Sequence, residues 1–164
     1  MAKTQVDSAQ LKDGLVDSHY IKLCLSAGQN VATGTEDTPA DIVWETALTK
    51  SPNTTAFHNV ASNAARIYPQ QAGIWLFTTQ IYFTADSTGI RVARINLNGI
   101  SRALVSTLGH GTNNQRIQAS AMIIVSNVGT DYITVGAGHN SGTTLALGSG
   151  ENDTWVYGLL VRRL

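Results

Sequence analysis

Cysteine is almost absent from this 164-residue sequence: Cys24 stands alone, so the chain cannot form an internal disulfide. Charge is scarce as well, at 13% against about 25% in an average soluble domain. The 11 basic and 11 acidic residues balance, which leaves no basic excess to bind nucleic acid or an anionic membrane. We therefore expect no nucleic-acid and no membrane partner. Low and balanced charge instead favours a protein that packs against other protein.

Long apolar runs are missing too. No stretch reaches the about 20 apolar residues needed to cross a bilayer. The first 18 residues contain no apolar core of signal-peptide length. We therefore expect the protein to be made in the cytoplasm and to stay soluble.

Motifs for catalysis and metal binding are not evident. The glycines follow no phosphate-binding spacing, and "GSGEN" at 148–152 does not fit the Gly-x-Ser-x-Gly frame of a nucleophile elbow. A hydrolase using acidic residues between 36 and 45 remains a minor alternative. The histidines show no chelating spacing, although the last two lie in glycine-rich loops that could meet: they are His19, His58, His110 and His139. We expect no enzyme, no metal site and no cofactor.

What the sequence does contain is a series of short alternating segments. Residues 1–18 are polar and lack strand-length alternation, so we interpret them as an N-terminal arm, with 19–164 as the folded domain. Asn98-Gly99 predicts a two-residue hairpin, and 49–55 reads as a loop. We expect strands at 20–26, 41–46, 65–69, 73–83, 90–99, 100–106, 116–127, 132–139, 144–148 and 151–164. Such spacing indicates an antiparallel sandwich or jelly roll.

The strand expected at 73–83 is unusual because both of its faces are apolar. Its odd positions, including Trp75, Phe77 and Phe83, can fill a core between two sheets. Its even positions are Ile74, Leu76, Thr78, Gln80 and Tyr82. Large apolar patches rarely stay exposed on a monomer, so this second face needs a cover. Other copies of the chain could supply it, or a loop of the same chain could fold over it.

The order of these pieces resembles the jelly roll of the tumour necrosis factor and complement globular-head superfamily. The pieces are Pro69, Ala-Gly at 72–73, Ile-Trp-x-Phe at 74–77, "RINLNG", "VGTDYITV" and the closing "TWVYGLLVRRL". Similar sequences with the "R…INLNG" strand occur in bacteriophage virion proteins. The arm "KTQVDSAQLKDGLVD" also looks like leader segments of phage fibre and head proteins.

The resemblance implies a two-sheet antiparallel jelly roll that packs as a homotrimer around a threefold axis. Trp75 and Phe77 match inward aromatics of the family. The implied trimer interface comprises Leu76, Thr78, Gln80, Tyr82 and, in the last strand, Val156. Thr78 departs from the family, which often has an aromatic there. The collagen-like stalk of the complement members is absent, so the arm must do any tethering.

We expect a bacteriophage virion protein, namely a trimeric decoration or cement protein on the capsid surface that is assembled in the host cytoplasm. Its partner would be the major capsid protein or another virion protein. The apolar residues that would anchor the arm are Val6, Leu11, Leu15 and Val16. The alternative is the trimeric receptor-binding tip of a tail or head fibre. Its loops at 27–40, 107–116 and 138–153 would then recognise a host surface glycan or protein.

Overall fold

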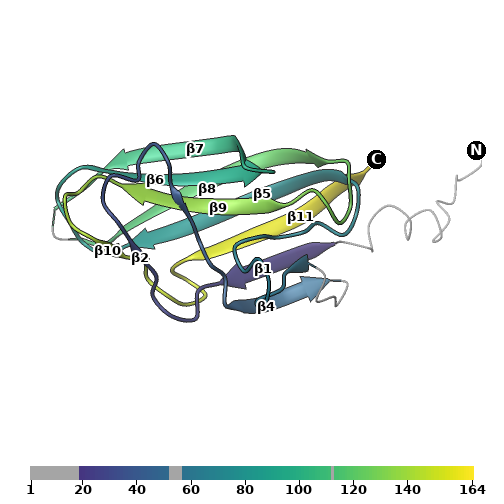
Figure 1. Cartoon of the computed structure of the whole chain (residues 1–164), viewed down its shortest axis with the longest axis horizontal. Helices are drawn as coiled ribbons and strands as arrows, with labels where there is room; N and C mark the ends of the chain where they lie inside the picture. The colour runs from purple at the N-terminus through teal and green to yellow at the C-terminus, as the bar shows by residue number, and fades with distance from the viewer. Residues whose placement is uncertain (1–18, 52–56, 112) are drawn as a thin grey trace, which may run out of the picture.

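The computed structural model describes residues 19–51, 57–111 and 113–164 and contains two antiparallel sheets packed face to face (Figure 1). The strands are β1 (Tyr20–Cys24), β2 (Asn30–Val31), β3 (Ala40–Asp41), β4 (Thr46–Ser51), β5 (Gly73–Phe83), β6 (Ile90–Leu97), β7 (Ile100–Leu108), β8 (Gln115–Val125), β9 (Ile133–His139), β10 (Leu145–Ala146) and β11 (Trp155–Arg163). Within these described ranges, no helix is long and apolar enough to cross a membrane. The expected all-β jelly-roll class is confirmed.

The large sheet has the order β4-β1-β11-β5-β8, and the small sheet has the order β3-β9-β6-β7. Strands β2 and β10 form a separate short pair. The core lies between the two sheets and includes the odd-numbered side chains of β5, as expected. In it the Trp75 ring stacks on the Phe77 ring with centroids 5.8 Å apart, and Phe57 meets the edge of Trp75. One face of β5 is therefore fully covered by the chain's own fold.

Three expectations for residues 41–69 were wrong. The strand expected at 41–46 ends at Asp41, because Ile42 still donates to Val135 of β9 but Trp44 donates to Ala64 in a loop. The segment expected as a strand at 65–69 contributes a single bridge, from Ile67 to Ile133. The start of the loop expected at 49–55 belongs instead to β4, which pairs with β1. The arm expected at 1–18 lies outside the described residues, so its boundary stays a prediction.

The sandwich has two distinct ends. Strand β1 begins and β11 ends at one end, together with the turns at 98–99 and 126–132; we call this the proximal end. The connections from β5 to β6, from β7 to β8 and from β9 to β11 gather at the opposite end, which we call the distal end (Figure 1). The described chain thus begins at the proximal end and presents most of its long loops at the distal end.

Close packing in the large sheet depends on a glycine. Gly158 of β11 lies directly opposite Phe77 of β5. A Cβ atom at Gly158 would come within 2.4 Å of the Phe77 ring. That ring is fully buried and stacks on Trp75, so moving it aside disturbs close-packed core side chains.

We expect Gly158→Ala to lower the free energy of unfolding by about 1–3 kcal/mol, the usual cost of forcing extra volume into a packed core. Urea unfolding measures the loss. The matched test is Phe77→Leu alone and together with Gly158→Ala, because the smaller side chain makes room for the new methyl group. The double variant should be less destabilised than the sum of the single variants. Simple additivity would contradict the proposed clash.

The proximal end is held by hydrogen bonds between two turns. Asn98 has a left-handed φ of 51° in the β6–β7 hairpin, and its amide group donates to Asp131 at 2.9 Å. The Asp131 carboxylate also accepts from the backbone N–H groups of Ser126 and Asn127, at 3.0 and 2.9 Å. The Asn127 N–H, then the Asn98 amide and the Ser126 N–H, hold the pKa of Asp131 below its usual range.

A lowered carboxyl pKa adds stability above the unfolded-state pKa of about 3.9, and this stability is lost as pH falls through the folded-state value. We expect Asp131→Asn to cost about 2 kcal/mol at pH 7, because its amide group faces other donors. The difference from the unmodified protein should shrink between pH 4 and pH 2. Urea unfolding across this range measures it, and a difference that stays constant would contradict the assignment.

Candidate functional site

The outer face of the large sheet, which points away from the small sheet, is the surface that the sequence marked for interaction. The even-numbered side chains of β5 lie on it, and most of them are only half-buried. Leu76 is flanked by Met122 of β8 and Leu159 of β11 in the strand register. One row nearer the proximal end, Ile74 pairs with Ile124.

These residues form an apolar patch. Met122 is 66% exposed and Ile124 is 59% exposed, which is unusual for large apolar side chains. We use the name apolar patch for Ile74, Leu76, Met122, Ile124 and Leu159. Nothing in the described chain covers the ends of Met122 and Ile124, so this part of the face remains bare.

The distal half of the same face is covered by the chain itself. The Gln80 amide group donates to the backbone carbonyls of Asn152 and Asp153, at 2.6 and 3.0 Å. Gln80 is therefore buried by the loop that leads into β11. Gly148 of that loop packs against the Tyr82 ring. The guanidinium of Arg116, on β8, lies 4.6 Å from the centroid of the same ring. The alternative of a loop folding over the face thus holds for its distal half.

Val156 does not lie with the other expected interface residues. It is 0% exposed and belongs to the core between the sheets. The reason is strand register: Val156 pairs with Thr79, which is on the inner face of β5, whereas Tyr157 pairs with Thr78 on the outer face. The outward residues of β11 are therefore Trp155, Tyr157 and Leu159, and the expectation for Val156 was wrong.

A shallow groove of about 460 Å³ lies on the outer face between the apolar patch and the distal loops. Three strands form its floor, and the loop before β11 forms its wall. Its lining residues are Lys22, Thr78, Glu151, Asn152, Trp155 and Tyr157. Thr78, which was expected at a threefold axis, lines the groove. Its hydroxyl group forms a hydrogen bond of 3.0 Å with the hydroxyl group of Ser120.

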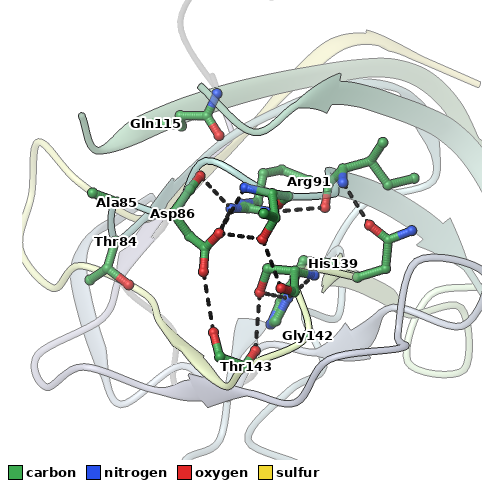
Figure 2. A network of polar contacts seen from close by, with 12 residues as sticks. Thr84, Ala85, Asp86, Arg91, Gln115, His139, Gly142 and Thr143 are labelled. Carbon is green, nitrogen blue, oxygen red and sulfur yellow. Dashed lines mark hydrogen bonds and ion pairs between the residues drawn. The ribbon is translucent and has the colours of Figure 1, made fainter. Parts of the chain in front are cut away.

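The distal loops are tied together by a polar network around Arg91 (Figure 2). This fully buried side chain donates to the carbonyls of Asp86 and Thr88, each at 2.8 Å, and to that of Ile90. Burial lowers the pKa of the Arg91 guanidinium, and the Asp86 carboxylate 3.8 Å away opposes that shift. Hydrogen bonds from Thr88, and to a lesser degree Thr143 and the Arg91 charge, lower the pKa of Asp86.

His139 belongs to this network and is inaccessible to a ligand. Its Nε2 lies 2.8 Å from the Val31 carbonyl, and its Nδ1 lies 3.1 Å from the Ser141 hydroxyl. His110 is exposed on the neighbouring loop, whereas His139 is fully buried. Across the described ranges, no three His, Cys, Asp or Glu side chains cluster in a way that could hold a metal ion. The network organises the loops structurally.

The candidate anchor residues cannot be placed. Val6, Leu11, Leu15 and Val16 lie outside the described residues. Their role rests on the sequence alone.

The sequence reasoning missed the groove and the Arg91 network. One signal for the groove was present, because Trp155 and Tyr157 alternate with the apolar Val156 and so must share a face. The partners on β1 and β5 are far away in sequence, and alternation within one strand cannot identify them. The Arg91 network gave no sequence signal, since its acceptors are backbone carbonyls.

Comparison with solved structures places the fold among tumour necrosis factor and complement globular domains. The globular domain of the zebrafish complement 1qA protein matches with a TM-score of 0.61 at 7% identity, over 89% of this chain and 99% of that one. Murine APRIL at pH 5.0 matches at 0.64 and 11% identity, over 87% and 98%. Eiger TNF from S. frugiperda matches at 0.54 and 14% identity, over 90% and 93%.

These likenesses establish the jelly-roll fold, and at such low identity they establish the fold alone. No protein-family model matches the sequence. No curated protein matches it significantly either.

Proposed function

We propose that the protein is a homotrimeric structural protein of a bacteriophage virion that decorates and cements the capsid surface. The observation that supports self-association most directly is the apolar patch on the outer face of the large sheet. Its exposed side chains would lose contact with water in an interface, and each Å² of buried apolar area is worth about 25 cal/mol.

A second exposed surface on the same subunit supports a closed ring. Among the described strands, β7 is the edge of the small sheet and pairs with β6 alone. Leu104 is 53% exposed and Leu108 is 73% exposed on it. A long edge strand with exposed apolar side chains is a liability unless another chain covers it.

The apolar patch and the β7 edge are different surfaces, so contact between them is head-to-tail. Head-to-tail contacts generate rings when the rotation closes and filaments when it does not. In a threefold ring, each β7 edge would lie on the neighbour's apolar patch, so both surfaces would be covered on all three subunits. This geometry agrees with the trimer that the sequence resemblance implies.

The two ends of the sandwich fit a knob attached to a particle. Residues 1–18 would leave from the proximal end, where β1 begins, and reach neighbouring capsid subunits. Three arms on one trimer would bind together with an avidity far above that of one arm, because the first contact raises the effective concentration of the others. The distal loops would then point away from the particle.

The distal end also supports the alternative function, a receptor-binding fibre tip. Its loops are rich in Asn, Thr, Ser and Gly, and the Arg91 network holds several of them in fixed positions (Figure 2). Fixed polar loops can recognise a host glycan or protein without a large ordering cost. Copy number separates the two functions, since a cement protein is present in hundreds of copies per particle and a fibre tip in few.

We expect Leu76→Asp to raise the dissociation constant of the trimer by about 100-fold or more, because the interface would bury an unpaired carboxylate. Leu104→Asp on β7 should do the same. Sedimentation equilibrium measures both, with Val60→Asp as the control, since Val60 is exposed on a loop between β4 and β5.

Mixing the two variants tests the head-to-tail geometry. Leu76→Asp keeps an intact β7 edge, and Leu104→Asp keeps an intact apolar patch. These two surfaces can form one contact between the variants, so the mixture should form heterodimers and no trimer. An unchanged trimer for Leu76→Asp would refute the assigned interface. Restoration of a full trimer by mixing would refute the head-to-tail geometry.

We expect the double variant Leu11→Asp/Leu15→Asp to remain a trimer and to lose capsid binding, because the anchor would no longer bury apolar side chains. Co-sedimentation with capsids stripped of the native protein measures binding. Leu76→Asp is the complementary control, since it should bind weakly through single arms. Saturation of the capsids by the arm variant at the concentration of the unmodified protein would refute the anchor.

A further inference from the structure

The groove on the outer face carries a feature that the proposed assembly does not use: two outward aromatic side chains in a row. Trp155 and Tyr157 are half-buried and stand two residues apart on β11, which places them about 7 Å apart along the strand. The Tyr20 ring on β1 continues the row, with its centroid 6.5 Å from that of Tyr157. The row offers flat apolar surfaces at the edge of water, where amphipathic rings commonly bind ligands.

Polar groups converge on the same groove and are unused by the protein. Among the described residues, no hydrogen bond or ion pair is made by the side chains of Lys22, Glu151, Asn152, Trp155 and Tyr157. They offer an ammonium, a carboxylate, an amide, an indole N–H and a phenol. A few convergent polar groups around an aromatic surface are the usual composition of a small-molecule site, and about 460 Å³ is a usual volume.

The charges in the groove balance. Burial raises the pKa of the Cys24 thiol, the Glu151 carboxylate adds to that shift, and the Lys22 ammonium opposes it. Both charges therefore act on the same point beside the groove. A balanced pair disfavours the phosphates of a nucleic acid, which require a basic surface. It suits a neutral or zwitterionic ligand with many hydroxyl groups.

We propose that this groove is a saccharide-binding site for a neutral or zwitterionic glycan. The apolar C–H faces of sugar rings stack on Trp155 and Tyr157. Their hydroxyl groups bond to Asn152, Glu151 and Lys22, and the opposite charges of the last two also accept an amino sugar beside a carboxylate.

The site is built before a ligand arrives. Its floor is three paired strands, and its wall is the loop that Gln80 holds through two backbone carbonyls. Little ordering cost is left for binding. The groove residues on the strands lie one or two rows to the distal side of Leu76, and Tyr20 at the end of the aromatic row shares a row with Leu76. The inference goes beyond the proposed assembly and does not depend on it.

The experiment probes the full-length protein with a printed array of neutral and zwitterionic glycans, followed by titration of the best free oligosaccharide monitored by saturation-transfer NMR. We expect saturable binding that Trp155→Ala weakens at least 10-fold and that Asn152→Ala also weakens. Tyr68→Ala is the matched control, because Tyr68 is a half-buried aromatic near the proximal end. It should change the affinity less than twofold.

Absence of saturable binding to any glycan on the array would overturn the proposal, and so would equal affinity for Trp155→Ala. Hydroxyl-radical oxidation of Trp155 in the assembled protein is an independent readout. Bound glycan should protect Trp155, and protection without glycan would overturn the proposal by showing that a neighbouring subunit fills the groove. Glycan binding by a stable monomer would support the groove and contradict the trimer, so the two proposals fail separately.

Discussion

Strand β5 has to be covered on both of its faces, and the rest of the structure depends on how this is done. Its inner face is covered by the small sheet, with Trp75 and Phe77 at the centre of the core. Its outer face is covered unevenly. The loop before β11 bonds to Gln80 and closes the distal half, whereas Leu76 and Ile74 in the proximal half have only half-exposed or exposed neighbours. The proximal half of the outer face would be stabilised by contact with another protein chain, because contiguous exposed apolar surface is unfavourable in water.

The same uneven cover divides the surface into regions of different chemistry. The proximal half of the outer face and the β7 edge offer apolar side chains suited to protein contact. The distal half carries a groove with aromatic rings and unpaired polar groups, suited to a small hydrophilic ligand. The Arg91 network links the distal loops by hydrogen bonds, and the single Cys24 excludes an internal disulfide there. An attached knob with an outward recognition surface is consistent with both proposed functions.

The sequence predicted the strands whose pattern of residue types is complete within one segment. The strand expected at 73–83 has those bounds, the strand expected at 116–127 is β8 at 115–125, and the Asn98-Gly99 hairpin followed from turn chemistry. It failed where the outcome depends on pairing between distant strands. Val156 was assigned to the wrong face because only its register with Thr79 shows which way it points. Gln80 was expected in an interface, but it is buried by its own chain. Its partner is a backbone carbonyl of a loop 72 residues away, which the sequence pattern around Gln80 does not reveal. The groove requires β1, β5 and β11 together, so no single segment could reveal it.

The number of chains in the unmodified protein tests the central claim most directly. Native mass spectrometry at micromolar concentration should give a species of three times the 17.5 kDa chain, without significant dimer. Heavy accumulation of filaments would mean that the head-to-tail contact does not close. A species of 17.5 kDa that persists at tens of micromolar would show that the proximal half of the outer face of β5 stays exposed to solvent, and would contradict the account.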